Sequence, residues 1–270
     1  MVYKVGFIGT GNMGGALLKS IVAGDTDNHY PISAFDVNQS LLNELAKDYG
    51  VTAKTSILDL IADSDIIILA VKPQYCTDVL NQIKQALTPN QILVSIVVGL
   101  PISYYKEILG AGTKVIRTMP NTPAMVGEGM TLVCYDELTS LDERKAVMKL
   151  LSFSGLAEEL EERLMNEVTA LTGSSPAYVF LFIEAMADAA VQSGIPRSLA
   201  YRLAAQAVLG SAKMVLETGK HPAELKDMVC SPAGTTIEAV AALERAGFRN
   251  AVITAMGECT KKAREIGRKK

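Results

Sequence analysis

In the first part of the chain, short apolar runs alternate with helical patterns. Five of these runs are VGFIG at 5–9, ISAFD at 32–36, DIIILAV at 65–71, ILVSIVV at 92–98 and KVIRTM at 114–119. Most are too apolar for strands with one face in water, and continuous apolar runs are typical of parallel sheets covered by helices on both faces. The pattern predicts a doubly wound α/β domain over residues 1–162.

The rhythm changes after the acidic stretch EELEERLMNE at 158–167. The remaining sequence predicts only helices, at 176–194, about 197–218, about 221–228, about 235–246 and about 249–268. Ser175 before Pro176 has the order of an N-cap and a first helical residue, and Gly194 and Gly219 are suited to end helices. We therefore expect a second, all-α domain over residues 163–270.

Composition and charge narrow the possible functions. A chain of 270 residues with 49% apolar residues can build two cores, and its net charge of −3 gives no support for nucleic-acid binding. The 4 cysteines lack metal-ligand spacing, so we expect no metal site, no disulfide framework and a cytoplasmic location. No leader pattern precedes the first predicted strand. The most apolar helix, at 176–191, carries Glu184 and Asp188, which favours a buried interface helix over a membrane span.

A glycine motif follows the first predicted strand. The sequence VGFIGTGNMGG places G-x-G-x-x-G at Gly9, Gly11 and Gly14, between that strand and a predicted helix. In this context Gly9 makes the tight turn, Gly11 admits a dinucleotide pyrophosphate to the backbone, and Gly14 lets the helix pack on the strand. The helix N-terminus then faces the phosphates. The alternative is that the glycines serve only the turn.

Two further strand ends belong to the expected cofactor site. Asp36 ends the next strand, and its carboxylate can accept hydrogen bonds from a ribose 2′-hydroxyl. No Lys or Arg lies between Asp36 and Lys47 to neutralise a 2′-phosphate, which favours NADH over NADPH; a capping or turn role is the alternative. LAVKP, at 69–73, ends another strand at the ligand-binding edge of such a sheet, and Lys72 adds positive charge. A plain strand end is the alternative there.

The longer motifs resemble those of the pyrroline-5-carboxylate reductase family over nearly the whole chain. They are FIGTGNMG, AVKP, RTMPNTPAMVGEGMT, TALTGSSPAYVFLFIEAMADAA, GFRNAVITAM and, most specific of all, KDMVCSPAGTTIEAVAAL at 226–243. The resemblance implies hydride transfer from NADH or NADPH to the C=N carbon of 1-pyrroline-5-carboxylate, giving L-proline. It also implies a Rossmann domain and a helical domain that interleaves with a second subunit, with dimers often assembled into rings.

The resemblance assigns the substrate site to the most specific motif. It points to Thr236 as a hydroxyl that bonds the imine nitrogen, and to Ser231, Gly234 and Thr235 as holders of the substrate carboxylate. From the residues alone, T-x-x-E predicts a capping box with Thr235 as N-cap and Glu238 as its partner. Gly234 allows close backbone approach, so the helix N-terminus is suited to an anion. A capped helix without a ligand is the alternative.

Other positions enter through the resemblance as well. It places Glu162 against the substrate and Asn121 beside the nicotinamide, with a solvated acidic face and an ordinary turn as the alternatives. Val97 and Val98 stand where the family has alanines, and Asp36 stands where NADPH-preferring members tend to have a small polar residue. The expected cofactor contacts are Gly9, Thr10, Gly11, Asn12, Met13, Gly14, Asp36, Ala70, Val71, Lys72, Pro73 and Val98.

Two rival interpretations have weaker support. A β-hydroxyacid dehydrogenase has the same layout but resembles a Lys-dependent enzyme, and no Lys occurs between Arg163 and Arg197. A catalytically silent NAD(P)-binding sensor is a different class of protein. The presence of both halves of the expected site argues against it.

Overall fold

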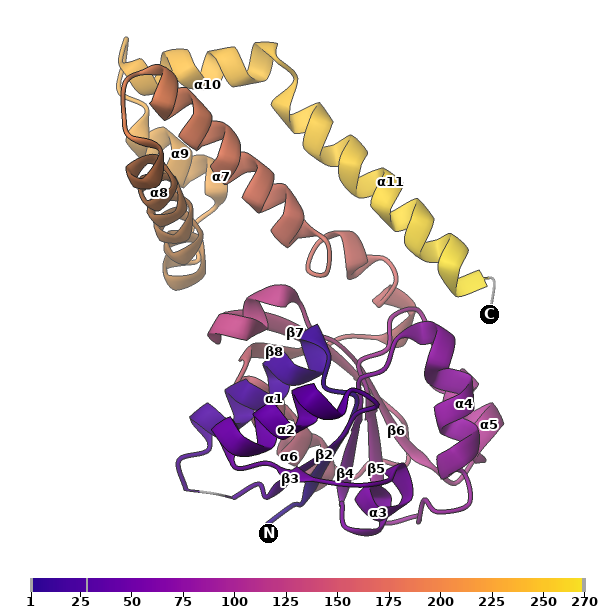
Figure 1. Cartoon of the computed structure of the whole chain (residues 1–270). Coiled ribbons are helices and arrows are strands. Elements are labelled where there is room, and N and C mark those ends of the chain that lie inside the picture. Colours follow the sequence, from indigo (N-terminus) through magenta and orange to yellow (C-terminus); the bar gives the residue numbers. More distant parts are fainter. Residues whose placement is uncertain (1, 28, 269–270) are drawn as a thin grey trace. The chain divides into compact units, whose positions relative to one another are not determined.

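The computed structural model describes residues 2–27 and 29–268. The chain forms two compact units (Figure 1). One unit comprises Met1–Gly173 with Thr260–Lys270, and the other comprises Ser174–Cys259. The first is built around a sheet and the second is wholly helical.

The sheet unit contains a single sheet of eight strands in the order β3-β2-β1-β4-β5-β6-β7-β8. The strands are β1 (Val5–Ile8), β2 (Ile32–Phe35), β3 (Thr52–Ala53), β4 (Ile66–Leu69), β5 (Ile92–Ser95), β6 (Lys114–Met119), β7 (Gly129–Tyr135) and β8 (Gly155–Glu159). Strands β1 to β6 are parallel, whereas β7 runs antiparallel to β6 and β8 runs parallel to β7. The direction of strand addition reverses between β1 and β4, and a doubly wound sheet binds ligands at such a switch point.

The five apolar runs all form strands of this sheet, which confirms the predicted doubly wound domain. The sheet extends further than those runs, because β7 and β8 follow β6. Strand β8 has the sequence GLAEE and no buried residue, so its charged character fits a sheet edge rather than the centre. Nothing in its hydrophobic pattern distinguishes it from a surface segment.

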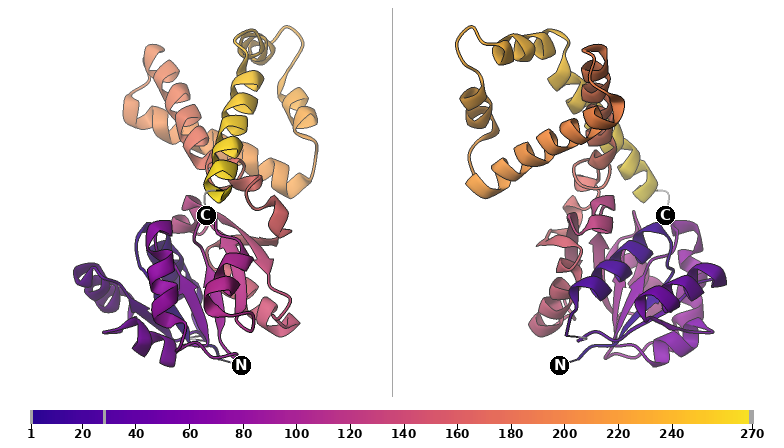
Figure 2. Two further views of the ribbon diagram at one scale, coloured as in Figure 1. Left: turned by 90° about the vertical axis from the view of Figure 1, so that its right-hand side faces the viewer. Right: turned by 60° about the vertical axis from the view of Figure 1, so that its left-hand side comes forward.

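Helices cover both faces of the sheet (Figures 1 and 2). One face carries α1 (Asn12–Gly24), α2 (Gln39–Tyr49) and α6 (Leu141–Ser152), and the other carries α3 (Ile57–Ala62), α4 (Pro73–Ile83) and α5 (Ile102–Leu109). Successive strand residues point to opposite faces. Phe7 therefore packs in the first core and Ile8 in the second, and both are about fully buried. This two-sided burial is the reason that the strands are continuously apolar.

Three short 3₁₀ segments complete the sheet unit: η1 (Thr122–Val126), η2 (Glu162–Leu164) and η3 (Val168–Ala170). The helical unit contains α7 (Ser175–Gln192), α8 (Arg197–Thr218), α9 (Pro222–Val229) and α10 (Thr235–Arg245), together with the first part of α11 (Phe248–Arg268). The predicted helices agree with these bounds to within two residues. The predicted cap of α7 was wrong: Ser174 is the N-cap, and Ser175 is already helical before Pro176.

The helical unit leaves most of its apolar surface uncovered. Among its described residues, only Ala187, Ala200 and Ala204 are buried. Large apolar side chains are exposed instead, among them Leu181 at 67% and Leu216 at 73%. In Figure 2 the helices of this unit form an open frame rather than a closed bundle. Apolar surface of this extent marks an interaction site.

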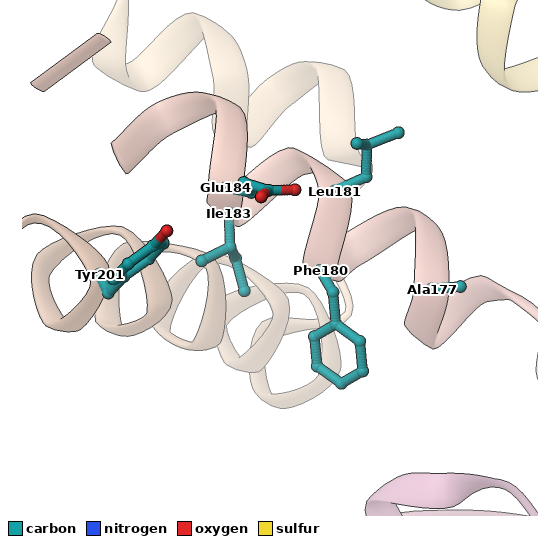
Figure 3. Close-up of a pocket in the computed structure, with 6 residues that line it drawn as sticks. All are labelled: Ala177, Phe180, Leu181, Ile183, Glu184 and Tyr201. Carbon is teal, nitrogen blue, oxygen red and sulfur yellow. The ribbon is translucent and has the colours of Figure 1, made fainter. Parts of the chain in front are cut away.

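Helix α7 is the most apolar element of the chain. By length and composition, the helical stretch Val168–Gln192 is the one part of the described chain that could cross a membrane. This is weak support for a span, because α7 carries Glu184 and Asp188 and packs along α8. A groove of about 570 Å³ lies between the two helices, lined by Phe180, Ile183 and Tyr201 with Ala177, Leu181 and Glu184 (Figure 3).

Candidate active site

The glycine motif forms a tight turn between β1 and α1. Gly9 has φ +94°, a conformation that other residues rarely adopt. A Cβ on Gly14 would lie 2.5 Å from the carbonyl oxygen of Gly9 and 2.8 Å from Cβ of Ala70, so only glycine allows this packing. A Cβ on Gly11 would meet no described atom within 4 Å. The space in front of Gly11 is therefore open, as a backbone that receives a pyrophosphate requires.

The N-terminus of α1 is suited to an anion. Gly11 is its N-cap and makes no side-chain hydrogen bond to the helix, and the first turn, which includes Asn12 and Met13, contains no acidic residue. The free N–H groups and the helix dipole are thus available to phosphate oxygens. The residues of the motif fit the dinucleotide that the sequence predicts.

Asp36 follows β2 and points back to the glycine turn. Its Oδ2 accepts hydrogen bonds from the backbone N–H of Thr10 at 2.6 Å and from the Thr10 hydroxyl at 2.9 Å. Its Oδ1 accepts a bond from the N–H of Asn38 at 2.8 Å. Thr10 is 2% exposed and Asp36 is half-buried, so the carboxylate is held rigidly at the surface of the predicted ribose site. The bond from the Asn38 N–H also gives Asp36 the alternative role of a turn residue, whereas the capping role is excluded because Asn38 is the N-cap of α2.

The segment after β4 brings a second helix N-terminus to the same edge of the sheet. Ala70 donates its N–H to the carbonyl of Ile8 in the neighbouring β1 at 2.9 Å. Val71 and the exposed Lys72 follow, and Lys72 is the N-cap of α4, with Pro73 as the first helical residue. No side chain caps this helix and its first turn contains no acid. Like α1, α4 therefore presents positive potential at the switch point.

The loop after β5 separates two neighbouring valines. Val97 is 2% exposed and packs in the core, whereas Val98 is 53% exposed. The start of the loop is fixed by Ser95. Its hydroxyl accepts the N–H of Val97 at 3.1 Å and lies 2.6 Å from the hydroxyl of Tyr105. Burial raises the pKa of Tyr105 well above its ordinary value, so this phenol stays protonated. Of the two valines, Val98 is therefore the accessible one.

Asn121 follows β6 and braces the backbone around it. Its side-chain oxygen accepts the N–H of Met130 at 2.9 Å, and its side-chain nitrogen donates to the carbonyl of Thr172 at 3.0 Å. It is buried, at 9% exposure. Within the described chain, both ends of the amide are thus engaged with the backbone.

Glu162 lies in an acidic stretch of sequence, yet its side chain makes two hydrogen bonds within the protein. Its Oε1 accepts the N–H of Ile102 at 2.7 Å and a bond from Arg117 at 3.3 Å. The side chain of Arg117 is only 6% exposed. Sequence reasoning missed Arg117, although one signal was present: a lone cation inside the apolar run KVIRTM has to find a partner.

The turn before α10 differs from the prediction. Gly234, with φ −80° and ψ 168°, is the N-cap and offers no side chain, so the predicted capping box of Thr235 and Glu238 is wrong. Helix α10 begins at Thr235, which is exposed, while Thr236 is half-buried. Because no side chain caps the helix, its first N–H groups are left for another partner.

The turn itself is compact and strained. The N–H of Gly234 donates to the carbonyl of Ser231 at 3.0 Å, with Pro232 and Ala233 between them. Ala233 has φ +56°, the one positive φ among the described residues other than glycine. A Cβ on Gly234 would lie 2.3 Å from Oγ of Ser231, so a side chain at position 234 would collide with that hydroxyl. Strain of this kind persists where the surroundings require a particular backbone.

One of the two histidines has a structural role. His221 is the N-cap of α9, and its Nδ1 accepts the N–H of Ala223 at 3.1 Å. In the described part of the chain, no group of three His, Cys, Asp or Glu side chains could hold a metal ion. The groove between α7 and α8 is lined mainly by apolar side chains, with the Glu184 carboxylate and the Tyr201 phenol as its polar groups (Figure 3).

Comparison with known families agrees with both units. The family model described as pyrroline-5-carboxylate reductase dimerisation matches residues 162–266. The family model described as NADP oxidoreductase, coenzyme F420-dependent, matches residues 4–99. The first covers the helical unit and the second covers the strands around the switch point.

Full-length relatives were also found. The chain is 46% identical to a pyrroline-5-carboxylate reductase of Escherichia coli (strain K12), over 99% of this chain and 100% of that protein. It is 43% identical to one of Methanosarcina acetivorans, over 98% of each chain. A crystal structure of the pyrroline carboxylate reductase of Plasmodium falciparum with NADP bound is 33% identical, with a TM-score of 0.87 and coverage of 98% of both chains.

Proposed function

The chain belongs to the pyrroline-5-carboxylate reductase family, and we propose which of its residues carry out each part of that reaction. It is an NAD(P)-dependent oxidoreductase that reduces 1-pyrroline-5-carboxylate to L-proline, the last step of proline biosynthesis. The two units contribute differently to this chemistry, since the cofactor motif lies in the sheet unit and the most specific motif lies in the helical unit.

The sheet unit binds the dinucleotide. The turn at Gly9, Thr10 and Gly11 and the N-termini of α1 and α4 hold the pyrophosphate, a role that the open space at Gly11 and the two uncapped helices support. When bound, the reduced nicotinamide supplies the hydride. Asn12, Met13, Gly14, Ala70, Val71, Lys72 and Pro73 line the same edge.

Asp36 makes NADH the preferred form of the cofactor. Its carboxylate is held in place by Thr10 and Asn38 and retains lone pairs for the ribose 2′-hydroxyl. The same negative charge repels a 2′-phosphate, and the sequence up to Lys47 supplies no cation to offset it. The repulsion should therefore decide the preference.

Thr236 and the N-terminus of α10 bind the substrate. The carboxylate of 1-pyrroline-5-carboxylate accepts hydrogen bonds from the free N–H groups behind Gly234, together with Ser231 and Thr235. The Thr236 hydroxyl bonds the ring nitrogen, which orients the C=N carbon for hydride attack. Protonation of that nitrogen makes the carbon more electrophilic.

Three further residues complete the site. Val98 is the exposed residue of the β5 loop and lies against the nicotinamide ring. Asn121 shapes the neighbouring loop through its two backbone contacts. Glu162 contacts the substrate with Oε2, because its bonds to Ile102 and Arg117 both use Oε1.

The assembly follows from the helical unit. The chain carries the dimerisation domain of its family, which supports self-association. We further infer that the helical domains of two subunits interleave, that dimers form a ring and that the protein is cytoplasmic. The functional domain boundary at 162/163 is supported by the family match that begins at residue 162, whereas the compact units divide after Gly173. Light scattering of the full chain measures the number of subunits.

The uncapped N-terminus of α10, with Thr236 in its first turn, is the observation that carries this proposal. Its test is an assay of NADH and NADPH oxidation by the full chain, with and without 1-pyrroline-5-carboxylate. Oxidation should require the imine and should be more efficient with NADH. A folded protein that binds either nucleotide but oxidises neither would instead be a silent sensor.

A further inference from the structure

Arg117 is a buried cation in the middle of the sheet unit. It belongs to β6, its residue is 5% exposed, and it pairs with Ser95 of β5 on one side and Cys134 of β7 on the other. A guanidinium in such a place loses most of its hydration, so it requires hydrogen-bond acceptors within the protein. The acceptors that Arg117 contacts therefore show which segments it fixes in place.

The partners of Arg117 come from the segment that follows the sheet. Its Nη1 donates to Oε1 of Glu162 at 3.3 Å, and its Nη2 donates to Oδ1 of Asn166 at 3.1 Å. A cavity of only about 10 Å³ separates this part of β6 from the 97–99 loop and from residues 165–169. Residues of all three segments thus line one small cavity.

Glu162 transmits this contact to the loop after β5. The same Oε1 accepts the N–H of Ile102, the first residue of α5, at 2.7 Å. The N-cap of α5 is Pro101, which makes no side-chain hydrogen bond, so the carboxylate takes the place of a local cap. A residue 60 positions away in the chain thereby fixes the start of α5.

The loop is consequently held at both ends. At its start the Ser95 hydroxyl accepts the N–H of Val97, and at its end Glu162 accepts the N–H of Ile102. Between them lie the exposed Val98 and Gly99, whose φ is +84°. If Glu162 lost its orientation, the end of the loop at Ile102 would be released, and Gly99 lies three residues before it.

We propose that Arg117 is a positioning residue of the reductase: it orients Glu162, which caps α5 and sets the conformation of the 96–101 loop at the nicotinamide-binding edge. The inference rests on the proposed function, since that function assigns the nicotinamide to Val98. Arg117 itself touches neither substrate nor cofactor in this scheme. Its effect on the reaction passes through Glu162 and the Ile102 amide.

Hydrogen exchange of the cofactor-free protein tests this independently of activity. Arg117→Met should speed exchange of the amides in peptides covering 96–104 by about tenfold, because a charge-assisted contact that orders the loop is lost. The matched control is Lys114→Met, which removes the ion pair of Lys114 with Glu143 (2.6 Å) at the other end of the same strand. The control should leave exchange at 96–104 unchanged. Equal exchange in Arg117→Met and the wild type would overturn the proposal.

Kinetics provide a second readout that a general loss of stability would not reproduce. Arg117→Met should raise KM for the nucleotide and lower kcat, each by about tenfold, whereas Lys114→Met should keep both near wild type. In a Glu162→Ala background, Arg117→Met should add less than about a twofold effect, since the pathway is already broken. Additive effects of the two substitutions, or an equal effect of Lys114→Met, would contradict the pathway.

An unfolded Arg117→Met variant and an inactive wild type would each be informative. If Arg117→Met does not fold, Glu162→Ala and Arg117→Lys take its place, and normal exchange at 96–104 in Glu162→Ala then rejects the proposal. If the wild type itself fails to reduce the imine, the proposed function fails, and the exchange measurement still decides whether Arg117 orders the loop.

Discussion

Thr10 donates two hydrogen bonds to a single oxygen of Asp36, one from its backbone N–H at 2.6 Å and one from its hydroxyl at 2.9 Å. The contact joins the glycine turn after β1 to the end of β2. It holds the carboxylate in a defined orientation at the position where a ribose hydroxyl is expected. The proposed preference for NADH therefore rests on a charge whose position is fixed by Thr10.

Replacing Asp36 should change that preference. Asp36→Ser removes the negative charge, so the ratio of kcat/KM for NADPH to that for NADH should rise about tenfold or more. Steady-state kinetics with both nucleotides measure the ratio. Asp48→Ser, at an exposed position in α2, is the control for loss of charge alone. An unchanged ratio in Asp36→Ser would remove Asp36 from nucleotide selection.

Two glycines of the same motif should respond differently to alanine. Gly14→Ala introduces a Cβ 2.5 Å from the Gly9 carbonyl, so it should lower the free energy of unfolding by about 1–3 kcal/mol. Gly11→Ala meets no described atom within 4 Å, so the fold should survive while the Kd for nucleotide rises about tenfold or more. Thermal unfolding and nucleotide titration separate the two effects. Tight binding by Gly11→Ala would argue against phosphate contact there.

Thr236 should matter for the chemical step rather than for cofactor binding. Thr236→Ala is expected to lower kcat/KM for 1-pyrroline-5-carboxylate about 100-fold, because the hydrogen bond to the ring nitrogen is lost. The Kd for nucleotide should stay within about twofold. Thr236→Ser keeps the hydroxyl and is the matched control, so it should retain most of the activity. Equal losses in the Ala and Ser variants would point to packing instead of hydrogen bonding.

The strained residue of the turn before α10, where we propose that the substrate binds, gives a test of backbone geometry. Ala233 has φ +56°, a conformation that costs an L-residue about 1–2 kcal/mol and glycine almost nothing. Ala233→Gly should be as stable as the wild type or up to about 1 kcal/mol more stable, after the entropy cost of glycine is subtracted. Ala233→Val should be less stable than both. Identical unfolding temperatures for the Gly and Val variants would contradict the strained turn.

Acid should weaken one ion-pair network in the sheet unit. Hydrogen bonds from Lys4 and Lys54, at 2.8 and 2.7 Å, lower the pKa of Asp63 from 3.8 to about 2. A carboxylate with a folded-state pKa below its unfolded-state value stabilises the fold above the unfolded-state pKa, and this contribution is lost as the pH falls towards the folded-state pKa.

Asp63→Asn should therefore lower the free energy of unfolding at neutral pH. The expected loss is about 0.2–1 kcal/mol, because the Asp63 side chain is 44% exposed and solvent screens the pairs. The difference from the wild type should shrink as the pH falls from 3.8 to about 2. Denaturant unfolding over this pH range measures it, with Asp78→Asn as an exposed control. A difference that grows on acidification would contradict the assigned ion pairs.

Much of the fold could be predicted because its signals are local. Strand β4 (Ile66–Leu69) is apolar over its whole length, and the glycine motif that starts at Gly9 follows β1 directly, so each element can be recognised within a few residues. The motif at 226–243 is likewise continuous in the sequence, so the family could be recognised from it. Strand β8 has no such signal, since an edge strand of sequence GLAEE is paired only because β7 lies beside it.

The sequence by itself determined the doubly wound sheet, the helical second unit, the reductase family and the candidates Asp36 and Thr236. Tertiary structure alone decided that Gly234 rather than Thr235 caps α10, because T-x-x-E does not specify which residue leaves the helical conformation. It also decided that Arg117 reaches Glu162, 45 positions later in the chain. A buried guanidinium must find an acceptor, but which one it finds depends on how distant segments pack, and no local pattern contains that information.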